Sequence, residues 1–198
     1  MPASRLPIGD GCVLYTEVPN DPGVRRSLVL QVLFEASGQS GGGLRLARTS
    51  TGQPLVEGAD DVNVSWAHRP GFLLVGAARS RLGVDIEIAD RTFPCEDVVA
   101  VFFSPEDRRA FHGLMPAQRM QGFYLLWTLR EAYLKALGRG LDALLEQELD
   151  FSWVLRGRAV PEEIEETFLA PGLGKARLLS RLVRAKGRLL RVATITNI

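Results

Sequence analysis

Cysteine and histidine are scarce in this sequence, which excludes the common zinc and disulfide frameworks. Its 198 residues contain two cysteines, Cys12 and Cys95, and two histidines, His68 and His112. The cysteines are far apart and form no CxxC pair, so together with the histidines they do not complete a zinc ligand set. Two isolated thiols are typical of a protein kept reduced in the cytosol. We therefore expect neither a structural zinc site nor a disulfide scaffold.

The sequence also lacks the charge excess and the long apolar runs that mark other protein classes. Its formal net charge is +1, whereas a general nucleic-acid binder is usually more basic. No segment approaches the roughly 18 apolar residues of a membrane span. Residues 1–11 lack the apolar stretch of a secretion signal. We expect a cytoplasmic protein with no nucleic-acid or membrane partner.

Apolar residues make up 46% of the chain, enough for a core, and they are arranged in short periodic segments. Alternating segments predict strands, and spacings of three and four residues predict helices. The two kinds of element do not alternate strictly, which favours the α+β class. The predicted strands are 12–18, 44–48, 62–66, 72–78, 82–88 and 148–153, and the predicted helices are 22–36, 96–103, a short one begun by Ser104-Pro105, and 116–137.

The C-terminal pattern and the division of the chain are less defined. Arginines recur at helical spacing over residues 177–188, yet residues 188–196 also fit a strand. The only soft boundary is near residues 78–82. We expect an N-terminal half at residues 1–80 and a C-terminal half at 81–198.

One predicted strand carries two carboxylates. Because the side chains of a strand alternate between its faces, Val84, Ile86 and Ile88 would enter a core. Asp85 and Glu87 would share the opposite face, about 6–7 Å apart along the strand. Neighbouring carboxylates repel each other unless a cation lies between them, and hard divalent ions prefer oxygen ligands. A metal site and a solvated acidic face both fit this spacing when it is taken alone.

A further acidic residue lies on the longest predicted helix. Trp127, Glu131 and Lys135 are four residues apart and so share one helical face. A surface Glu–Lys pair is one explanation of this spacing. However, Tyr124 and Leu134 add apolar bulk beside this face, and a half-buried carboxylate needs a partner. A metal ion shared with the two strand carboxylates would supply that partner.

Two other segments carry weaker signals. Gly138-Arg139-Gly140 follows the long helix and fits a C-cap with a flexible turn. His68 falls between two predicted strands, where a lone loop histidine is usually structural or solvated. It can also donate a hydrogen bond to an anionic ligand. Neither segment indicates a site by itself.

Taken together, these segments resemble the 4′-phosphopantetheinyl transferase superfamily, of the surfactin-synthetase-activating (Sfp) type. Two blocks carry the resemblance, each weak alone and specific jointly: Gly83-Val84-Asp85-Ile86-Glu87, and residues 127–140 with Glu131, Lys135, Gly138 and Gly140. Gly52-Gln53-Pro54, residues 64–68 and Phe102-Phe103-Ser104-Pro105-Glu106 match as well. The resemblance covers about half of the chain, residues 51–151.

The resemblance implies a fold and an activity. The fold would be two similar α+β halves related by a pseudo-twofold, each a small, mostly antiparallel sheet packed on a long helix. The activity would be the Mg²⁺-dependent transfer of the 4′-phosphopantetheine arm of coenzyme A to a serine of an acyl or peptidyl carrier protein, releasing 3′,5′-ADP. Such carriers are usually acidic and serve fatty acid, polyketide or nonribosomal peptide synthesis, and enzymes of this type are usually monomers.

The resemblance also implies roles for individual residues. Glu131 would accept the proton of the carrier serine, and Lys135 would lie near the pyrophosphate of coenzyme A. The implied metal ligands are Asp85, Glu87 and Glu131, the implied catalytic residues are Asp85, Glu131 and Lys135, and the implied coenzyme A-binding residues are His68, Gln53, Arg25, Arg26, Lys135, Gly138 and Gly140.

The chain departs from the family pattern at a few positions. Gln53 and Arg130 stand where lysine is common, and Arg69 and Pro70 follow His68 where the family usually has small residues. The N-terminal half is also short. These departures concern the recognition of coenzyme A rather than the metal site.

Two alternative functions and two carrier-docking surfaces stay open. The same carboxylates would also suit a Mg²⁺-dependent phosphodiesterase, and the short N-terminal half would suit a non-catalytic member that binds a carrier protein or acyl-coenzyme A. The basic stretch at residues 175–191 is either a solvated face or a surface for an acidic carrier. The apolar segment at 111–123 and the helix after it offer another such surface.

Overall fold

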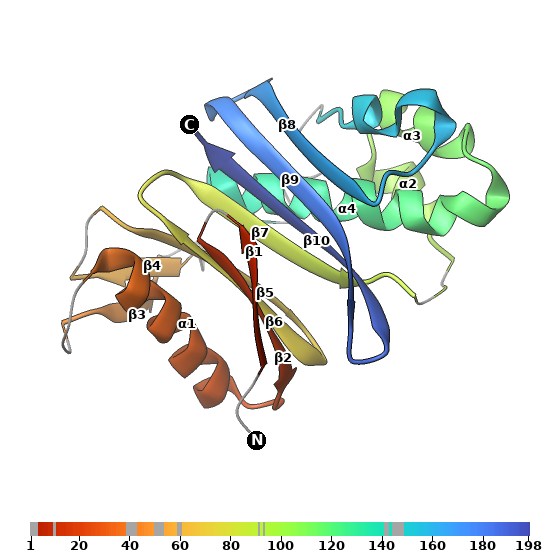
Figure 1. The fold of residues 1–198 in the computed structure, drawn as a ribbon. Coiled ribbons are helices and arrows are strands. Elements are labelled where there is room, and N and C mark those ends of the chain that lie inside the picture. Colours follow the sequence, from red (N-terminus) through yellow and green to blue (C-terminus); the bar gives the residue numbers. More distant parts are fainter. Residues whose placement is uncertain are drawn as a thin grey trace.

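The chain folds into two antiparallel sheets flanked by two long helices (Figure 1). The computed structural model describes residues 4–9, 11–38, 43–49, 54–58, 61–90, 92, 94–140, 143 and 149–198. The strands are β1 Ser4–Gly9, β2 Cys12–Val18, β3 Arg45–Arg48, β4 Pro54–Glu57, β5 Asn63–Arg69, β6 Gly71–Ala78, β7 Leu82–Ile88, β8 Glu163–Ala170, β9 Gly174–Ala185 and β10 Arg188–Asn197. The helices are α1 Pro22–Ser37, α2 Glu96–Phe102, α3 Pro105–His112, α4 Pro116–Leu137 and the 3-10 helix η2 Ser152–Arg158.

The two large sheets share a three-stranded core. Within the described residues each has four strands, in the order β1-β2-β6-β5 and β7-β10-β9-β8, while β3 and β4 pair separately. In each half, the strand that precedes the helices pairs with the last strand of that half. Strand β2 thus pairs with β6, and β7 pairs with β10. This shared core of three strands is consistent with a pseudo-twofold relation between the halves, while the fourth strands differ, since β1 adds beside β2 and β8 adds beside β9. The α+β class and the antiparallel sheets expected from the sequence are confirmed.

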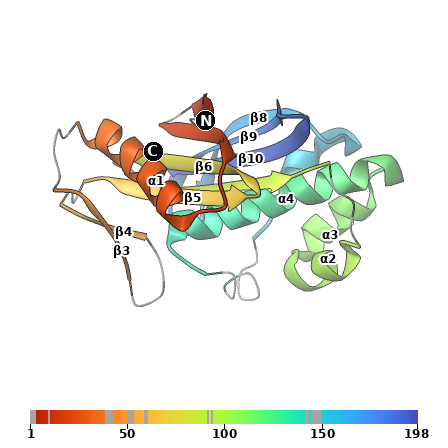
Figure 2. The ribbon, with the colours of Figure 1, turned by 90° about the horizontal axis from the view of Figure 1, so that it is seen from below.

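Alternating side chains stack α1, the first sheet, the second sheet and α4 as successive layers. Leu33 of α1 packs with Leu73 on the outer face of the first sheet. Leu74, one residue further along β6, packs with Ile86 in the core between the sheets. Helix α4 lies along the outer face of the second sheet (Figure 2). Leu129 of α4 belongs to the core between this helix and that sheet. None of the described helices is long and apolar enough to cross a membrane.

Helix α4 has the bounds expected from its end signals. Pro116 lies in its first turn, where a missing amide donor breaks no helical hydrogen bond. The helix ends at Gly138, whose φ of 71° is left-handed and therefore favours glycine. The amides of Gly138 and Arg139 donate to carbonyls of the last turn. These caps set the position of the acidic face of α4 along the second sheet.

A buried ion pair fastens α4 to the elements behind it. The side chains of Arg130 and Asp107 are both 0% exposed, and Arg130 Nε donates to Asp107 Oδ2 over 3.0 Å. The other oxygen of Asp107 accepts the amide of Phe151 at 2.8 Å. Burial raises the pKa of Asp107 to about 6, so the carboxyl is ionised at neutral pH. The pair therefore joins α3, α4 and the segment that leads into η2.

Two local expectations are wrong. The strand predicted over residues 148–153 does not form in its described part, because the chain there enters η2 at Ser152. Leu149 and Phe151 instead pack in the core beneath α4 just before η2, and Val154 of η2 joins the same core. His68 lies within strand β5, and not in the loop where the sequence pattern places it.

The C-terminal basic stretch forms strands, and its charges are largely paired. Strands β9 and β10 replace the helix that the arginine spacing also allowed. Arg191 is buried and donates to the backbone carbonyls of Pro161 and Glu162. Several other cations of the stretch pair with acids on neighbouring strands and turns: Arg177–Glu165, Arg181–Glu163, Lys186–Glu17 and Arg188–Asp90. The pairing reduces the positive charge that this surface presents.

Candidate functional site

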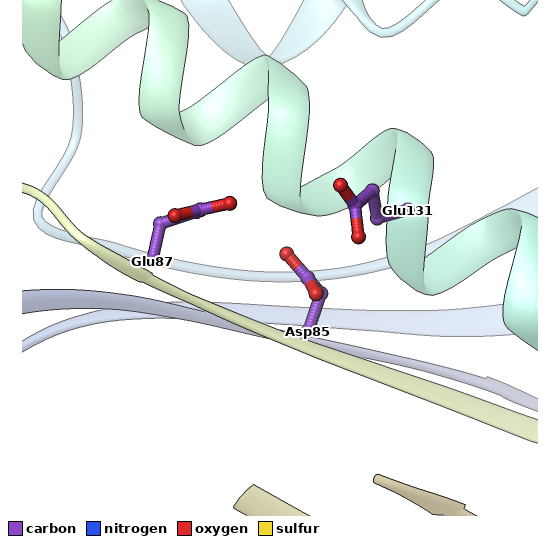
Figure 3. Close-up of side chains that lie close together, drawn as sticks. All are labelled: Asp85, Glu87 and Glu131. Atoms are coloured by element: carbon purple, nitrogen blue, oxygen red, sulfur yellow. The ribbon is translucent and has the colours of Figure 1, made fainter. Parts of the chain in front are cut away.

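Strand β7 turns its acidic side chains toward α4. Val84 and Ile86 are fully buried in the core between the sheets. Since strand side chains alternate, Asp85 and Glu87 point to the other side, where α4 lies (Figure 3). The bounds of β7, Leu82–Ile88, agree with the strand predicted from the sequence.

Gly83 allows α4 to approach this strand closely. A Cβ atom at this position would lie 1.8 Å from the carbonyl oxygen of Ala132 and 2.4 Å from the amide nitrogen of Ala136. Any side chain here would therefore push the helix backbone away. Because Ala132 follows Glu131 directly, the glycine brings the helix carboxylate close to those of the strand.

Three carboxylates converge between β7 and α4 (Figure 3). Asp85, Glu87 and Glu131 each offer one oxygen, and these oxygens all lie within 4.8 Å of one another. The exposed fraction is 1% for the side chain of Asp85, 12% for Glu131 and 13% for Glu87. In the part of the chain that the structure describes, this is the one group of three or more His, Cys, Asp or Glu residues placed closely enough to hold a metal ion.

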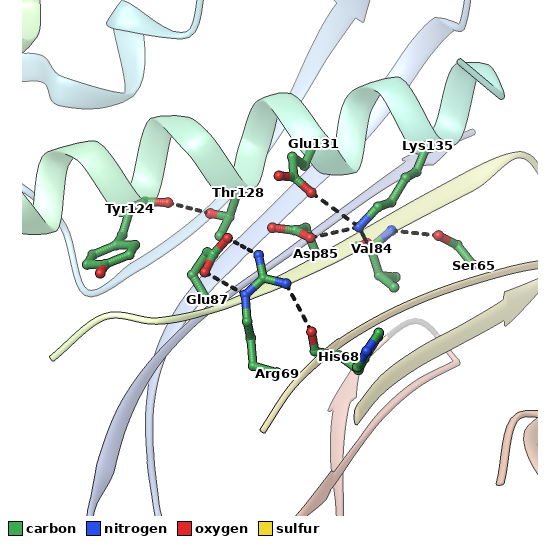
Figure 4. Close-up of polar contacts among 10 residues, drawn as sticks. All are labelled: Ser65, His68, Arg69, Val84, Asp85, Glu87, Tyr124, Thr128, Glu131 and Lys135. Carbon is green, nitrogen blue, oxygen red and sulfur yellow. Dashed lines mark hydrogen bonds and ion pairs between the residues drawn. The ribbon is translucent and has the colours of Figure 1, made fainter. Parts of the chain in front are cut away.

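Two cations reach into the cluster (Figure 4). Lys135 Nζ lies 2.7 Å from Asp85 Oδ1 and 3.6 Å from Glu131 Oε2. Arg69, at the end of β5 in the first sheet, donates from Nε to Glu87 Oε2 over 2.8 Å, and a second guanidinium nitrogen donates to Glu87 Oε1. When all three acids are ionised, the cluster carries an excess of one negative charge over its two cations.

Asp85 is the member of the cluster with an unpartnered carboxylate oxygen. Burial raises the pKa of its carboxyl to about 7, and the nearby Glu131 also acts to raise it, while Lys135 acts to lower it. Its Oδ2 is buried without a hydrogen-bond partner. A buried carboxylate oxygen without a partner is destabilising. A cation placed at this oxygen would remove the penalty.

The cluster fits a hard divalent ion. Its ligand atoms are all carboxylate oxygens, which Mg²⁺ prefers, and a partner is missing at Asp85 Oδ2. Asp85 and Glu131 can hold such an ion, and Glu87 is the third candidate ligand.

A cleft of about 660 Å³ adjoins the cluster. It is lined by parts of β4 and β5, the start of β7 and the C-terminal end of α4, and Lys135 belongs to both the cleft and the cluster. Among the described lining residues there is no Asp or Glu, whereas four are cations: Arg48, Arg81, Lys135 and Arg139. A cleft lined by charge of one sign concentrates oppositely charged ligands. The arrangement suits a ligand with several phosphate groups.

Part of the implied coenzyme A-binding set lies at this cleft. Lys135, Gly138 and Gly140 all line it. Gly138 ends α4 in the left-handed conformation, so the chain turns along the wall of the cleft. Gln53 lies outside the described residues.

The other implied binding residues lie away from the cleft lining. His68 is largely exposed on β5. The partial burial of its imidazole and the charges of Arg25, Arg69 and Lys135 lower its pKa. Arg25, in the first turn of α1, is thus close enough for its charge to act on His68. Arg26 instead donates to the carbonyl oxygen of Leu46 in β3, at 2.8 Å. The two neighbouring arginines therefore have different surroundings.

Sequence reasoning alone misses several residues of this site. Arg48, Arg81 and Arg139 line the cleft, and Trp66 lines it with Arg48 stacked 5.7 Å from its ring centroid. Arg69 was visible only as a departure from the family pattern. Trp66 could have been found, because it belongs to the segment 64–68 that matches the family pattern. The arginines share no period, and only folding brings them together.

The chain is similar to known proteins of one superfamily. A model of the 4′-phosphopantetheinyl transferase superfamily matches residues 81–169. The chain is 25% identical over 120 residues to a 4′-phosphopantetheinyl transferase of Bacillus subtilis, a match that covers 60% of this chain and 52% of that protein. It is 28% identical over 129 residues to the 4′-phosphopantetheinyl transferase HetI of Nostoc sp., covering 63% and 54% of the two chains. The chain spans about half the length of these relatives.

Proposed function

We propose, because this chain belongs to the 4′-phosphopantetheinyl transferase superfamily, that it transfers the 4′-phosphopantetheine group of coenzyme A to a serine of an apo acyl or peptidyl carrier protein. The other product would be 3′,5′-ADP. The observation that carries the proposal is the convergence of Asp85, Glu87 and Glu131 beside a cleft lined by cations. The matching family segment, residues 81–169, contains all three carboxylates.

The cleft supports coenzyme A as the donor of the transferred group. Coenzyme A carries a pyrophosphate and a 3′-phosphate, and its binding requires cations that offset this charge. Arg48, Arg81 and Arg139 line the cleft together with Lys135, which joins the cleft to the carboxylates. We propose that the arginines hold the nucleotide phosphates and that Lys135 lies nearest the reacting pyrophosphate.

Asp85 and Glu131 would hold Mg²⁺, with Glu87 as a third candidate ligand. A Mg²⁺ ion bound there would supply a Lewis acid that offsets the charge of the pyrophosphate.

Glu131 and Lys135 would carry the proton and charge changes of the transfer. Glu131 would accept the proton of the carrier serine as its oxygen forms a bond to the β-phosphorus of coenzyme A. The bond from that phosphorus to the 3′,5′-ADP oxygen breaks in the same step. Lys135, at 2.7 Å from Asp85 Oδ1, would stabilise the negative charge on the leaving group.

The wider setting is also a proposal. We infer a cytoplasmic monomer in which the chain divides near residue 80 into halves at 1–80 and 81–198. An acidic carrier would approach the open side of the carboxylate cluster. The ion pairs of the stretch at 175–191 favour a docking surface elsewhere. Met115, 62% exposed between α3 and α4, is one apolar contact on the alternative surface.

Mass spectrometry of apo carrier proteins incubated with this protein, coenzyme A and Mg²⁺ tests the proposal. We expect a mass gain of one phosphopantetheine group. Glu131→Gln should slow its appearance by about 10²–10⁴-fold, as for loss of a general base. Glu106→Gln is the matched control, because Glu106 also pairs with a cation on its own helix but lies on α3.

The products separate the competing functions. Hydrolysis of coenzyme A with an unmodified carrier would indicate a phosphodiesterase. Binding of coenzyme A or carrier without any product would indicate a non-catalytic member of the family. Undiminished transfer by folded Glu131→Gln protein would refute the role of the helix carboxylate.

A further inference from the structure

Arg69 connects the first sheet to the carboxylate cluster of the second. Its side chain is 32% exposed, and that of its partner Glu87 is 13% exposed. The guanidinium also donates from Nη1 to the carbonyl oxygen of His68 at 2.9 Å (Figure 4). The guanidinium is therefore hydrogen-bonded to the backbone of its own strand, β5, and to a side chain of β7.

Both carboxylate oxygens of Glu87 are occupied by this contact. Arg69 Nε donates to Oε2 at 2.8 Å, and a second nitrogen donates to Oε1. Such two-pronged arginine–carboxylate pairs are among the strong side-chain contacts of proteins. Asp85 differs, since its Oδ2 has no partner. An incoming cation would meet an open oxygen at Asp85 and two engaged oxygens at Glu87.

The charge of Arg69 acts on the whole cluster. Although burial lowers the pKa of Arg69, the hydrogen bond to Glu87 and the charges of Glu87, Asp85 and Glu131 outweigh it and raise the pKa above its usual value. The guanidinium thus stays charged at every accessible pH. A divalent ion entering the cluster is attracted by three carboxylates and repelled by this fixed cation.

We propose that Arg69 is a positioning residue that withholds Glu87 from divalent ions, so that Asp85 and Glu131 hold the ion and Arg69 sets its affinity. The inference rests on the metal centre of the proposed function. Arg69 acts through Glu87 and needs no contact with the ion itself. Its role is therefore distinct from those of the three carboxylates.

Binding of Mn²⁺, measured from the electron paramagnetic resonance signal of the free ion, tests this role without any turnover. Arg69→Gln should tighten the Mn²⁺ dissociation constant about tenfold, because it removes one positive charge and releases a third carboxylate. The double variant Arg69→Gln, Glu87→Gln should return to within about threefold of the unmodified protein. It restores the net charge of the cluster and keeps Asp85 and Glu131 as ligands.

The control is Arg5→Gln. Arg5 makes a similar two-pronged contact with Glu35 and is 39% exposed, but it lies on β1, at the opposite edge of the first sheet from β5, and its acid belongs to α1. It should leave Mn²⁺ affinity unchanged. Melting curves without metal show whether each variant is folded, and Arg69→Ala repeats the test with a smaller side chain.

The outcomes are distinguishable. Unchanged or weaker Mn²⁺ binding by both single variants, Arg69→Gln and Arg69→Ala, would overturn the inference while leaving the metal centre in place. A double variant that binds at least tenfold more weakly than the unmodified protein would also overturn it, because Glu87 would then already be a ligand. If no protein of the set binds millimolar Mn²⁺, the metal centre of the proposed function fails together with the inference.

Discussion

Replacing Gly83 by alanine should both destabilise the protein and displace its helix carboxylate. The added Cβ would lie 1.8 Å from the carbonyl oxygen of Ala132, whereas real Cβ contacts essentially never fall below 3.0 Å. The backbone of α4 must therefore retreat from β7 by about 1.2 Å. The obstacle is helix backbone and not the end of a flexible side chain, so the strain has little means of relaxing locally.

The structure allows both effects to be estimated. Overpacking of this kind lowers the free energy of unfolding by about 1–3 kcal/mol, and a backbone clash lies at the upper end. For a chain of this length, about 3 kcal/mol corresponds to a fall in Tm of roughly 6–12 °C. A displacement of about 1 Å at reacting groups commonly reduces rates by about 100-fold. Glu131 precedes the clashing Ala132, so transfer should fall by a similar factor even where the variant is folded.

Thermal unfolding followed by circular dichroism measures the fall in Tm. Carrier modification followed by mass spectrometry measures the fall in the transfer rate. Gly43→Ala is the matched control, because a Cβ at Gly43 meets nothing within 4 Å. It should leave Tm and transfer unchanged. A Gly83→Ala protein with the Tm and the transfer rate of the unmodified chain would refute the close packing of α4 on β7 as the source of the cluster.

Further predictions concern the buried ion pair, the acid of β7 and the cleft. Asp107→Ala should lower the free energy of unfolding in urea by about 3–5 kcal/mol, because it leaves the fully buried Arg130 without its partner; a loss under 1 kcal/mol would show that the site relaxes. Since burial raises the pKa of Asp85 to about 7, a proton competes with metal below that pH. Mn²⁺ affinity should therefore fall about tenfold for each pH unit below 7 and level off above it, and a flat profile from pH 5.5 to 8.5 would contradict this. Arg81→Ala and Arg139→Ala should each weaken coenzyme A binding in calorimetry, with a smaller salt dependence than the unmodified protein has; unchanged binding by both would remove the cleft as the coenzyme A site.

The carboxylate centre could be predicted because it depends on two local periods. The alternation of a strand places Asp85 and Glu87 on one side of β7, and the helical period places Glu131 and Lys135 on one side of α4. The end signals of α4 are equally local, since Pro116 and Gly138 act within one turn. Each of these features follows from neighbouring residues and needs no knowledge of the rest of the chain.

One open expectation and one failed expectation arise where a local pattern admits two solutions. Arginines four residues apart fit a helix, but a strand pair allows Arg177 and Arg181 to face Glu165 and Glu163 of β8. Likewise, residues 149–153 alternate as a strand would, yet packing under α4 selects the 3-10 helix that begins at Ser152. Tertiary contacts decide between such alternatives because their energies exceed intrinsic preferences.

From the sequence alone follow the α+β class, the bounds of β7 and α4, and the side of each on which an acid stands. The tertiary structure decided which cations meet those acids. Arg69 reaches Glu87 from a strand of the other sheet, 18 residues away in the chain, and Arg48, Arg81 and Arg139 gather around one cleft from segments with no common period. Strand and helix periods arise from backbone geometry within a few residues, whereas the partners of long charged side chains depend on how distant elements pack.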